Sequence, residues 1–297
     1  MSANSINRNN LLSSLSERQA EAVCHLDGPL LIVAGPGSGK TRVMAHRIAY
    51  LIDEHGVSTG NILAVTFTNK AARELRERCE ALVPGSRDYL QVRTFHGFCA
   101  KILRVDGGRI GVDTTYVIYD QDDQLRIVRR VLEEMDVDTR RFTPRSVLSV
   151  ISSAKNRGLD EGMFERDVLD RRYQENFSAY FHEIAARTYT RYGELLRASK
   201  ALDFDDLLLQ TVRLLESIPE VMGRYRDIYR YLLVDEFQDT NPLQLRIAKL
   251  LASKHRNLCV VGDPDQSIYS WRHADPSNLT EFQKSYPEAR LVTLDQS

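Results

Sequence analysis

A glycine-rich segment that ends in a lysine and a threonine carries the clearest chemistry in this 297-residue chain. It follows an apolar run, Leu30–Ala34, and precedes a stretch with helical spacing, so a strand, a loop and a helix succeed one another. This order matches the phosphate-loop pattern Gly-x-x-x-x-Gly-Lys-Ser/Thr, with Ala34 in place of the first glycine. The alternative interpretation is a glycine-rich turn without a ligand. The candidate phosphate-binding residues are Ala34, Gly35, Pro36, Gly37, Ser38, Gly39, Lys40 and Thr41.

Two side chains of this loop have the chemistry of a nucleoside triphosphate site. Successive backbone N–H groups and the positive end of the following helix attract phosphate oxygens. We expect Lys40 to reach the β- and γ-phosphates and the Thr41 hydroxyl to bind Mg²⁺. The loop therefore predicts a site for a nucleotide with its magnesium ion.

Acidic and amide side chains follow two further apolar runs. Asp235 and Glu236 end the first of them; a carboxylate there, beside a phosphate loop, is suited to hold Mg²⁺. We assign that task to Asp235, and to Glu236 the polarisation of the attacking water. Gln266, after the second run, has an amide that can orient the water and sense the γ-phosphate. Each has a simpler interpretation, a solvated turn for the acidic pair and an ordinary turn residue for Gln266. The predicted catalytic residues are Lys40, Glu236 and Gln266.

The short apolar runs alternate with helical patterns, which is typical of an α/β fold with a parallel sheet and crossover helices. After the first run, Met44, Ile48, Leu51 and Ile52 have the spacing of one helix face. The expected strands are Leu30–Ala34, Ile62–Phe67, Leu90–Thr94, Tyr231–Asp235, Leu258–Gly262 and Arg290–Leu294.

The middle of the chain has a different character, because charged and apolar residues there recur with helical period. The strand pattern resumes only after Asp203. We therefore expect a mainly helical subdomain at residues 109–202, inserted between the two halves of the α/β domain at residues 1–108 and 203–297. The clearest helical patterns are Asp123–Met135, Arg145–Lys155 and Phe177–Ser199.

Composition excludes several classes of protein. With 42% hydrophobic and 27% charged residues and no apolar run of about 18 residues, the chain has neither the pattern of a membrane span nor that of a disordered protein. Its first ten residues lack the apolar core of a secretory signal, so the cytoplasm is the expected compartment. Four widely separated cysteines support neither a disulfide framework nor a zinc site. The net charge of −1 gives no indication of a polyanionic partner, although a local basic patch is enough for one.

Taken together, the motifs resemble those of the UvrD/Rep/PcrA group of superfamily 1A DNA helicases. The resemblance extends along the whole chain, and its last two segments are the most specific. It implies a RecA-like P-loop NTPase sheet with an inserted helical subdomain, driven by ATP and Mg²⁺. The matching segments are Leu15 to Val23, Thr66 to Ala72, Thr94-Phe95-His96, Asp203 to Leu207, Val234 to Thr240, and Val261 to Arg272.

The resemblance also implies roles for side chains outside the loop. In this family Gln19 would pair with the adenine edge and Arg42 would stack on its face; the alternatives are a helix-surface glutamine and an exposed arginine of the first helical turn. Phe67, Tyr269 and Trp271 would stack on bases of single-stranded DNA, although any one aromatic is more often a core residue. From Thr66 to Arg109, nine basic and five acidic residues give a net charge of +4, a modest electrostatic support. The candidate DNA-binding residues are Phe67, Asn69, Lys70, Thr94, His96, Tyr269, Trp271 and Arg272.

Two functional hypotheses follow. In this family a second RecA-like domain supplies arginines to the γ-phosphate, and its first motif does not occur before Ser297. The chain is then expected to be the N-terminal, ATP-binding half of a 3′–5′ DNA helicase that acts on single-stranded DNA and on single-strand/double-strand junctions. Alternatively, the chain by itself is a module that binds nucleotide and single-stranded DNA with little turnover, because a missing arginine costs about 10³–10⁵ in rate.

Overall fold

The computed structural model of the chain describes residues 11–86, 89–170, 177–263 and 278–294. Its α-carbon contacts divide the chain into two compact units, one formed by Met1–Phe98 with Pro219–Ser297 and the other by Cys99–Ile218. Each unit has its own apolar core.

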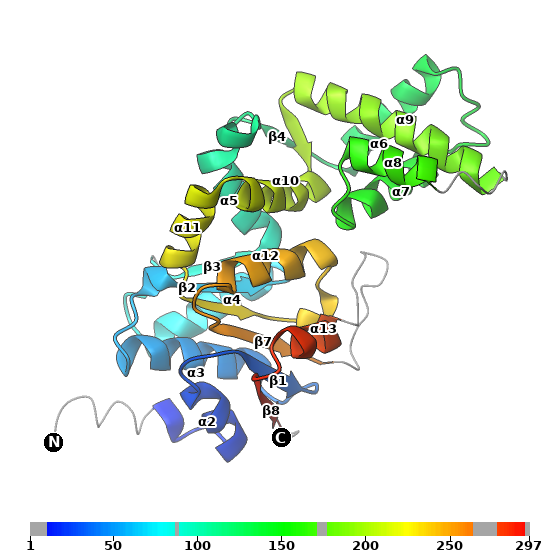
Figure 1. Ribbon diagram of the computed structural model, residues 1–297. Helices are drawn as coiled ribbons and strands as arrows, with labels where there is room; N and C mark the ends of the chain where they lie inside the picture. Colours follow the sequence, from blue (N-terminus) through cyan, green and yellow to red (C-terminus); the bar gives the residue numbers. More distant parts are fainter. Residues whose placement is uncertain (1–10, 87–88, 171–176, 264–277, 295–297) are drawn as a thin grey trace. The chain divides into compact units, whose positions relative to one another are not determined.

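A six-stranded parallel sheet forms the centre of the first unit (Figure 1). Its strand order is β3-β2-β6-β7-β1-β8, so strands distant in sequence are neighbours, as in the pairing of Leu30 with Cys259. The expected α/β class and all six expected strands are confirmed, with ends that differ by one residue at most. The strands are β1 (Leu30–Ala34), β2 (Ile62–Thr66), β3 (Gln91–Thr94), β6 (Tyr231–Val234), β7 (Leu258–Gly262) and β8 (Arg290–Leu294).

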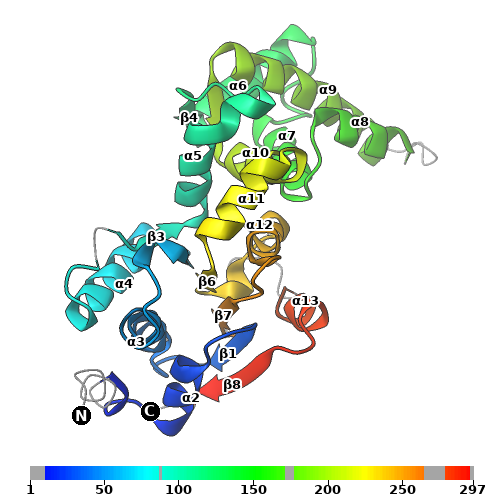
Figure 2. The same cartoon turned by 60° about the vertical axis from the view of Figure 1, so that its left-hand side comes forward.

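Helices cover both faces of this sheet. Figure 2 shows α3 and α4 on one side and α11, α12 and α13 on the other. The predicted helix after the loop is α3; Met44, Ile48 and Leu51 are fully buried in the core against β1, and Ile52 packs at its margin. The helices of this unit are α2 (Glu17–Cys24), α3 (Lys40–Asp53), α4 (Asn69–Leu82), α11 (Pro219–Ile228), α12 (Pro242–Ala252) and α13 (Asn278–Ser285), with short 3-10 helices η1 (Thr59–Asn61) and η3 (Phe237–Asp239).

The second unit is mainly helical, as expected. Its core is built from apolar faces of α6, α7, α8 and α9, with Val128, Ile151 and Tyr192 fully buried. Helices α5, α8 and α10 and the short parallel pair of β4 and β5 have no counterpart among the elements expected from sequence. The elements are α5 (Phe95–Asp106), η2 (Gly107–Ile110), β4 (Val117–Tyr119), α6 (Gln121–Glu134), α7 (Pro144–Asn156), α8 (Glu161–Asp170), α9 (Phe177–Ala198), β5 (Ala201–Asp203) and α10 (Phe204–Ser217).

The helical unit is longer than the segment 109–202 expected from sequence. It begins at Cys99, within α5, and ends at Ile218, after α10. The physical reason is that α10 packs against α7, β5 and η2, which all belong to the helical unit. Residues 203–218 therefore lie in the helical unit, whereas the sequence pattern placed them in the second half of the α/β domain, 203–297. In the part of the chain that the structure describes, no helix is both long and apolar enough to span a membrane.

Candidate nucleotide-binding site

The phosphate loop joins β1 to α3 at the carboxyl edge of the sheet. Gly37 and Gly39 have φ angles of 76° and 86°, in the left-handed region that favours glycine. The Ser38 hydroxyl is fully buried and donates to the Gly35 carbonyl over 2.7 Å, which closes the loop on itself. Gly39 provides no side-chain cap for α3, and the first turn of the helix carries no acidic residue. The N–H groups and positive dipole at this end of α3 therefore suit an anion.

Lys40 and Glu236 meet at this edge although 196 positions separate them. The Lys40 Nζ lies 3.0 Å from the Glu236 Oε2, and the lysine side chain is only 13% exposed. Glu236 has a φ of 47°, an uncommon left-handed conformation for a residue with a side chain. Strain of this kind is most often retained at functional sites. The structure thus brings together two of the three predicted catalytic residues; Gln266 lies outside the described residues.

Asp235 is buried beside this pair and has the environment of a cation ligand. Burial, together with the charge of Glu236, raises the pKa of Asp235 to about 6, while Lys40 lowers it. The carboxylate accepts one backbone N–H, from Glu236 over 3.0 Å, and no side chain within the described ranges donates to it. A buried carboxylate with free acceptor sites, together with the hydroxyl of Thr41, is a donor set that fits Mg²⁺.

Gln238 is a site residue to which the sequence analysis assigned no role. Its Nε2 donates to the Glu236 Oε2 over 2.8 Å, and its Oε1 accepts the Asp263 N–H over 3.0 Å. The side chain thereby ties the end of β6 to the end of β7. A Cβ added to Gly262 would lie 2.8 Å from the Gln238 Oε1, so glycine is needed for this close approach. The signals in the sequence are the position of Gln238 two residues after the acidic pair and its place in the matching segment Val234 to Thr240.

Gln19 lies in the first turn of α2 and reaches the phosphate loop. Its Nε2 donates to the Ser38 carbonyl over 2.9 Å, and its Oε1 accepts the Ser16 N–H over 3.1 Å. The side chain is buried, so the alternative of a helix-surface residue is wrong. The Arg42 guanidinium, at the start of α3, donates to the Ser14 carbonyl over 2.7 Å. Both residues stand beside the loop, and their contacts with adenine stay a prediction.

The described DNA-binding candidates follow β2 and β3 at the same carboxyl edge. Phe67 is half-buried just after β2, and Asn69 and Lys70 are exposed in the first turn of α4. The Lys70 ammonium lies 3.9 Å from Glu74 with 78% of its side chain exposed, so it is accessible to a phosphate. Because β2 pairs with β6, these residues are one strand away from the acidic pair.

The end of β3 provides two further candidates. Thr94 accepts the Gly97 N–H over 3.1 Å, so its hydroxyl already stabilises the start of α5, and His96 is half-buried in the same turn. Tyr269, Trp271 and Arg272 lie outside the described residues.

A parallel sheet that carries a phosphate loop at one strand end and an acidic pair at another defines a P-loop nucleoside triphosphatase domain. The family model of the UvrD/REP helicase N-terminal domain matches residues 15–287, and the chain belongs to this family. It is 46% identical over 289 residues to the ATP-dependent DNA helicase PcrA of Staphylococcus aureus and 45% identical to that of Bacillus subtilis. Each alignment covers 97% of this chain and 38% of the relative, so the chain spans less than two-fifths of the relatives' length and is homologous to their N-terminal part.

Proposed function

We propose that this chain is the ATP-binding half of an ATP-dependent 3′–5′ DNA helicase, in which hydrolysis is coupled to unwinding. One observation carries the proposal: Lys40, Asp235 and Glu236 gather beside the phosphate loop, with the Lys40 Nζ 3.0 Å from the Glu236 carboxylate. The relatives, which are named ATP-dependent DNA helicases, support the same activity. We include a cytoplasmic location in the proposal, because these relatives are proteins of bacteria, whose DNA lies in the cytoplasm.

Each of the gathered side chains has a task in the hydrolysis. Lys40 leaves Glu236 for the β- and γ-phosphates, and the released carboxylate accepts the proton of the attacking water. Asp235 and Thr41 would hold Mg²⁺, and the ion would supply positive charge to the phosphate oxygens. Gln19 and Arg42 contact the adenine. Gln266 orients the attacking water, on the strength of the resemblance alone.

Single-stranded DNA is the proposed track of this motor. The exposed Lys70 and the half-buried Phe67 support contacts with a phosphate and a base, since both follow β2, the neighbour of the strand that carries Glu236. A conformational change at the acidic pair would thus reach the DNA contacts across a single strand. The proposed contacts are Phe67, Asn69, Lys70, Thr94, His96, Tyr269, Trp271 and Arg272.

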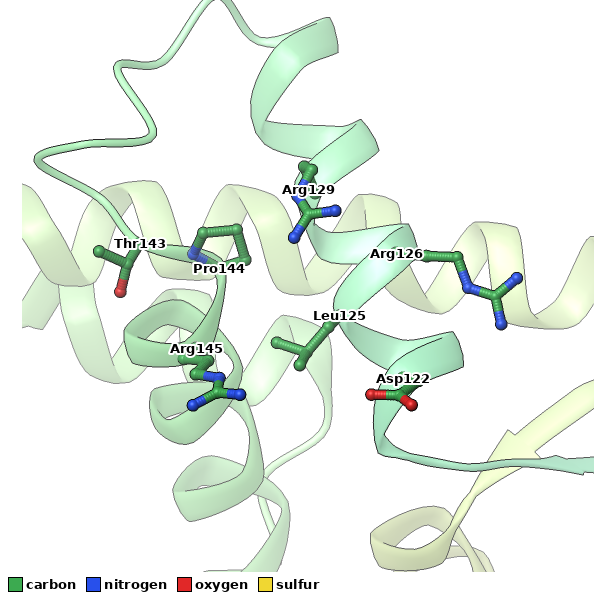
Figure 3. A pocket seen from close by; sticks show the side chains of 7 residues that line it. All are labelled: Asp122, Leu125, Arg126, Arg129, Thr143, Pro144 and Arg145. Atoms are coloured by element: carbon green, nitrogen blue, oxygen red, sulfur yellow. The ribbon is translucent and has the colours of Figure 1, made fainter.

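Exposed arginines of the helical unit support the proposal that this unit contacts the duplex side of a single-strand/double-strand junction. A hollow of about 610 Å³ lies where α6 passes the start of α7, and three exposed arginines, Arg126, Arg129 and Arg145, line it. Figure 3 shows Arg129 projecting from α6 toward the start of α7, and Arg126 projecting away from it. Exposed guanidinium groups of this kind bind phosphates irrespective of base sequence.

A second proposal concerns the chain as an isolated polypeptide, which we infer binds nucleotide and DNA but turns over slowly. The observation that favours it is the coverage of 38% of the relatives, because in this family a second RecA-like domain completes the nucleotide cleft. Without the arginines of that domain, the rate is expected to fall by about 10³–10⁵.

Steady-state ATPase assays with and without oligo-dT, beside calorimetric binding of ATP, test both proposals. The expected result is Mg²⁺-dependent ATP binding with little DNA-stimulated turnover; robust stimulation would refute the slow-turnover proposal, and absent ATP binding would refute the first. Trp271 is the only tryptophan, so single-stranded DNA is expected to quench the intrinsic tryptophan fluorescence of the chain. An unchanged spectrum at saturating DNA would remove Trp271 from the proposed contacts.

A further inference from the structure

Arg47 is a buried arginine of α3 whose guanidinium contacts backbone carbonyls. The residue is 2% exposed. Its Nη1 donates to the carbonyls of Ala22 over 3.1 Å, Val23 over 3.4 Å and His25, and its Nη2 lies 3.4 Å from the carbonyl of Leu26. Burial lowers the pKa of Arg47, and within the described ranges no carboxylate pairs with it. The guanidinium of Arg47 is thus buried in the sheet domain, where it donates hydrogen bonds to four backbone carbonyl oxygens.

Two of those oxygens, from Ala22 and Val23, belong to the last turn of α2, and the other two, from His25 and Leu26, directly follow the helix. The last four carbonyls of a helix have no partner within it, and the negative end of the helix dipole favours a cation. α2 has only eight residues, too few to be stable without tertiary contacts. Its C-cap, His25, has extended backbone, and the next residue is Leu26 and not glycine, so Arg47 takes the place of the usual glycine cap.

The other end of α2 reaches the phosphate loop through Gln19, whose Nε2 donates to the Ser38 carbonyl over 2.9 Å. Lys40 and Arg47 are both residues of α3, seven positions apart and hence on the same face of the helix. Helix α3 therefore carries the proposed phosphate-binding residue, Lys40, at its start, and Arg47, which holds the end of α2, two turns later. The position of Gln19 relative to the loop depends on contacts at both ends of α2.

We infer that Arg47 is a positioning residue for recognition of the nucleobase: by fixing the end of α2 to α3, it keeps Gln19 beside the phosphate loop. The inference rests on the proposed nucleotide site. On this inference the affinity for ATP has two contributions. Binding of the phosphates depends on the loop and α3, whereas discrimination between adenine and guanine depends on the placement of α2. A merely structural arginine would affect both parts equally.

The test compares Arg47→Lys with a matched control. The lysine keeps the charge and most of the stem but replaces a planar fork of donors by a single ammonium, which cannot reach carbonyls in several directions. The control is Arg290→Lys, since Arg290 also contacts α2, but through the half-buried side chain of Glu21 and with its own side chain exposed. Calorimetry on the whole chain would measure the affinities for ATP, GTP and inorganic tripolyphosphate, each with Mg²⁺.

We expect Arg47→Lys to weaken ATP about tenfold, which corresponds to the loss of about 1.4 kcal/mol, and to reduce the preference for ATP over GTP by the same factor. Tripolyphosphate affinity stays within about twofold of that of the unsubstituted chain, a margin well below the tenfold effect. Arg290→Lys changes none of the three. Equal weakening of ATP and tripolyphosphate, or an unchanged preference for ATP over GTP, would overturn the inference. Failure of the unsubstituted chain to bind ATP and tripolyphosphate would instead refute the proposed function.

Hydrogen exchange of the unsubstituted chain gives a second test that does not depend on the folding of a variant. The amides of α2 are expected to gain protection with ATP and not with tripolyphosphate, because only ATP engages Gln19. If ATP leaves the exchange of α2 unchanged, α2 does not respond to the base and the inference fails.

Discussion

Replacement of Lys155 by methionine is expected to destabilise the helical unit strongly. Lys155 is 1% exposed in α7, and its Nζ lies 2.7 Å from the Asp203 Oδ2 and 2.7 Å from the Asp206 Oδ1. It also lies 5.1 Å from the ring centre of Tyr192, whose hydroxyl donates to Asp203 over 2.8 Å. One ammonium thus joins α7 to the start of α10, where the two carboxylates also cap the helix by accepting each other's backbone N–H.

The size of the effect follows from the burial of the charges that remain. Burial works to raise the pKa of Asp203, but the Lys155 ammonium outweighs it and holds the pKa below its ordinary value. Burial and the charge of Asp203 raise the pKa of Asp206 to about 7. Methionine fills a similar volume but leaves both carboxylates without their cation, and removal of one partner of a buried ion pair costs about 3–5 kcal/mol. We expect a loss of that size in the free energy of unfolding.

The pH dependence of this loss identifies its cause. In the native chain Asp203 contributes stability above its unfolded pKa of about 4, and this stability disappears as pH falls through the lower folded pKa. In Lys155→Met the folded pKa of Asp203 rises instead, so the variant loses stability as pH increases above about 4. The difference between the two proteins is therefore expected to grow from pH 5 to pH 8.

Urea unfolding followed by circular dichroism, at several pH values, measures this difference. The control is Lys200→Met in the same unit, because the Lys200 ammonium lies 3.0 Å from Asp113 but is 67% exposed, and we expect little change at any pH. A loss for Lys155→Met that is small, or that does not vary with pH, would refute the electrostatic argument and leave only a packing effect.

Two further predictions concern the nucleotide site. Lys40→Ala is expected to abolish binding of Mg²⁺-ATP in calorimetry, because the loop loses its only cation for the β- and γ-phosphates; unchanged affinity would disprove the phosphate-loop assignment. Gly262→Ala is expected to lower the free energy of unfolding by about 1–3 kcal/mol, because the new Cβ would lie 2.8 Å from the Gln238 Oε1. Gly223→Ala, in α11 with no atom within 4 Å of its Cβ position, should instead stabilise by about 0.5–1 kcal/mol in the same urea titration, and equal effects of the two would contradict the steric explanation.

The sheet and the phosphate loop are predictable from sequence because their signals are local. Most strands of the sheet are short apolar runs, although β3, Gln91–Thr94, contains a single apolar residue, and the core strands β2 and β7 are buried at every position. The loop requires glycine at Gly37 and Gly39 for its backbone angles, so its pattern is confined to a few adjacent residues. Strand order is not local, and the parallel pairing of β1 with β7 is known only from the structure.

The contacts that hold the site together are not predictable in this way. Lys40 and Glu236 are 196 positions apart, and Gln238 meets Asp263 across 25. The sequence assigns no role to Arg47 or Lys155, because an arginine or a lysine in a helix is ordinarily exposed. Only the fold reveals that these two are buried, one by the carbonyls at a helix end and the other by two carboxylates.

The net charge of −1 is uninformative about a polyanionic partner because charges differ in availability. Arg47 and Lys155 are enclosed by acceptors of the protein itself and cannot meet a ligand phosphate. Lys70, Arg129 and Arg145 are exposed, and an approaching phosphate encounters these instead. Since the field at the surface depends on exposed groups within about 10 Å, the screening length at 0.1 M salt, a neutral total is compatible with a local site for DNA. The charge that a phosphate meets is therefore a property of each exposed patch and does not follow from the composition of the chain.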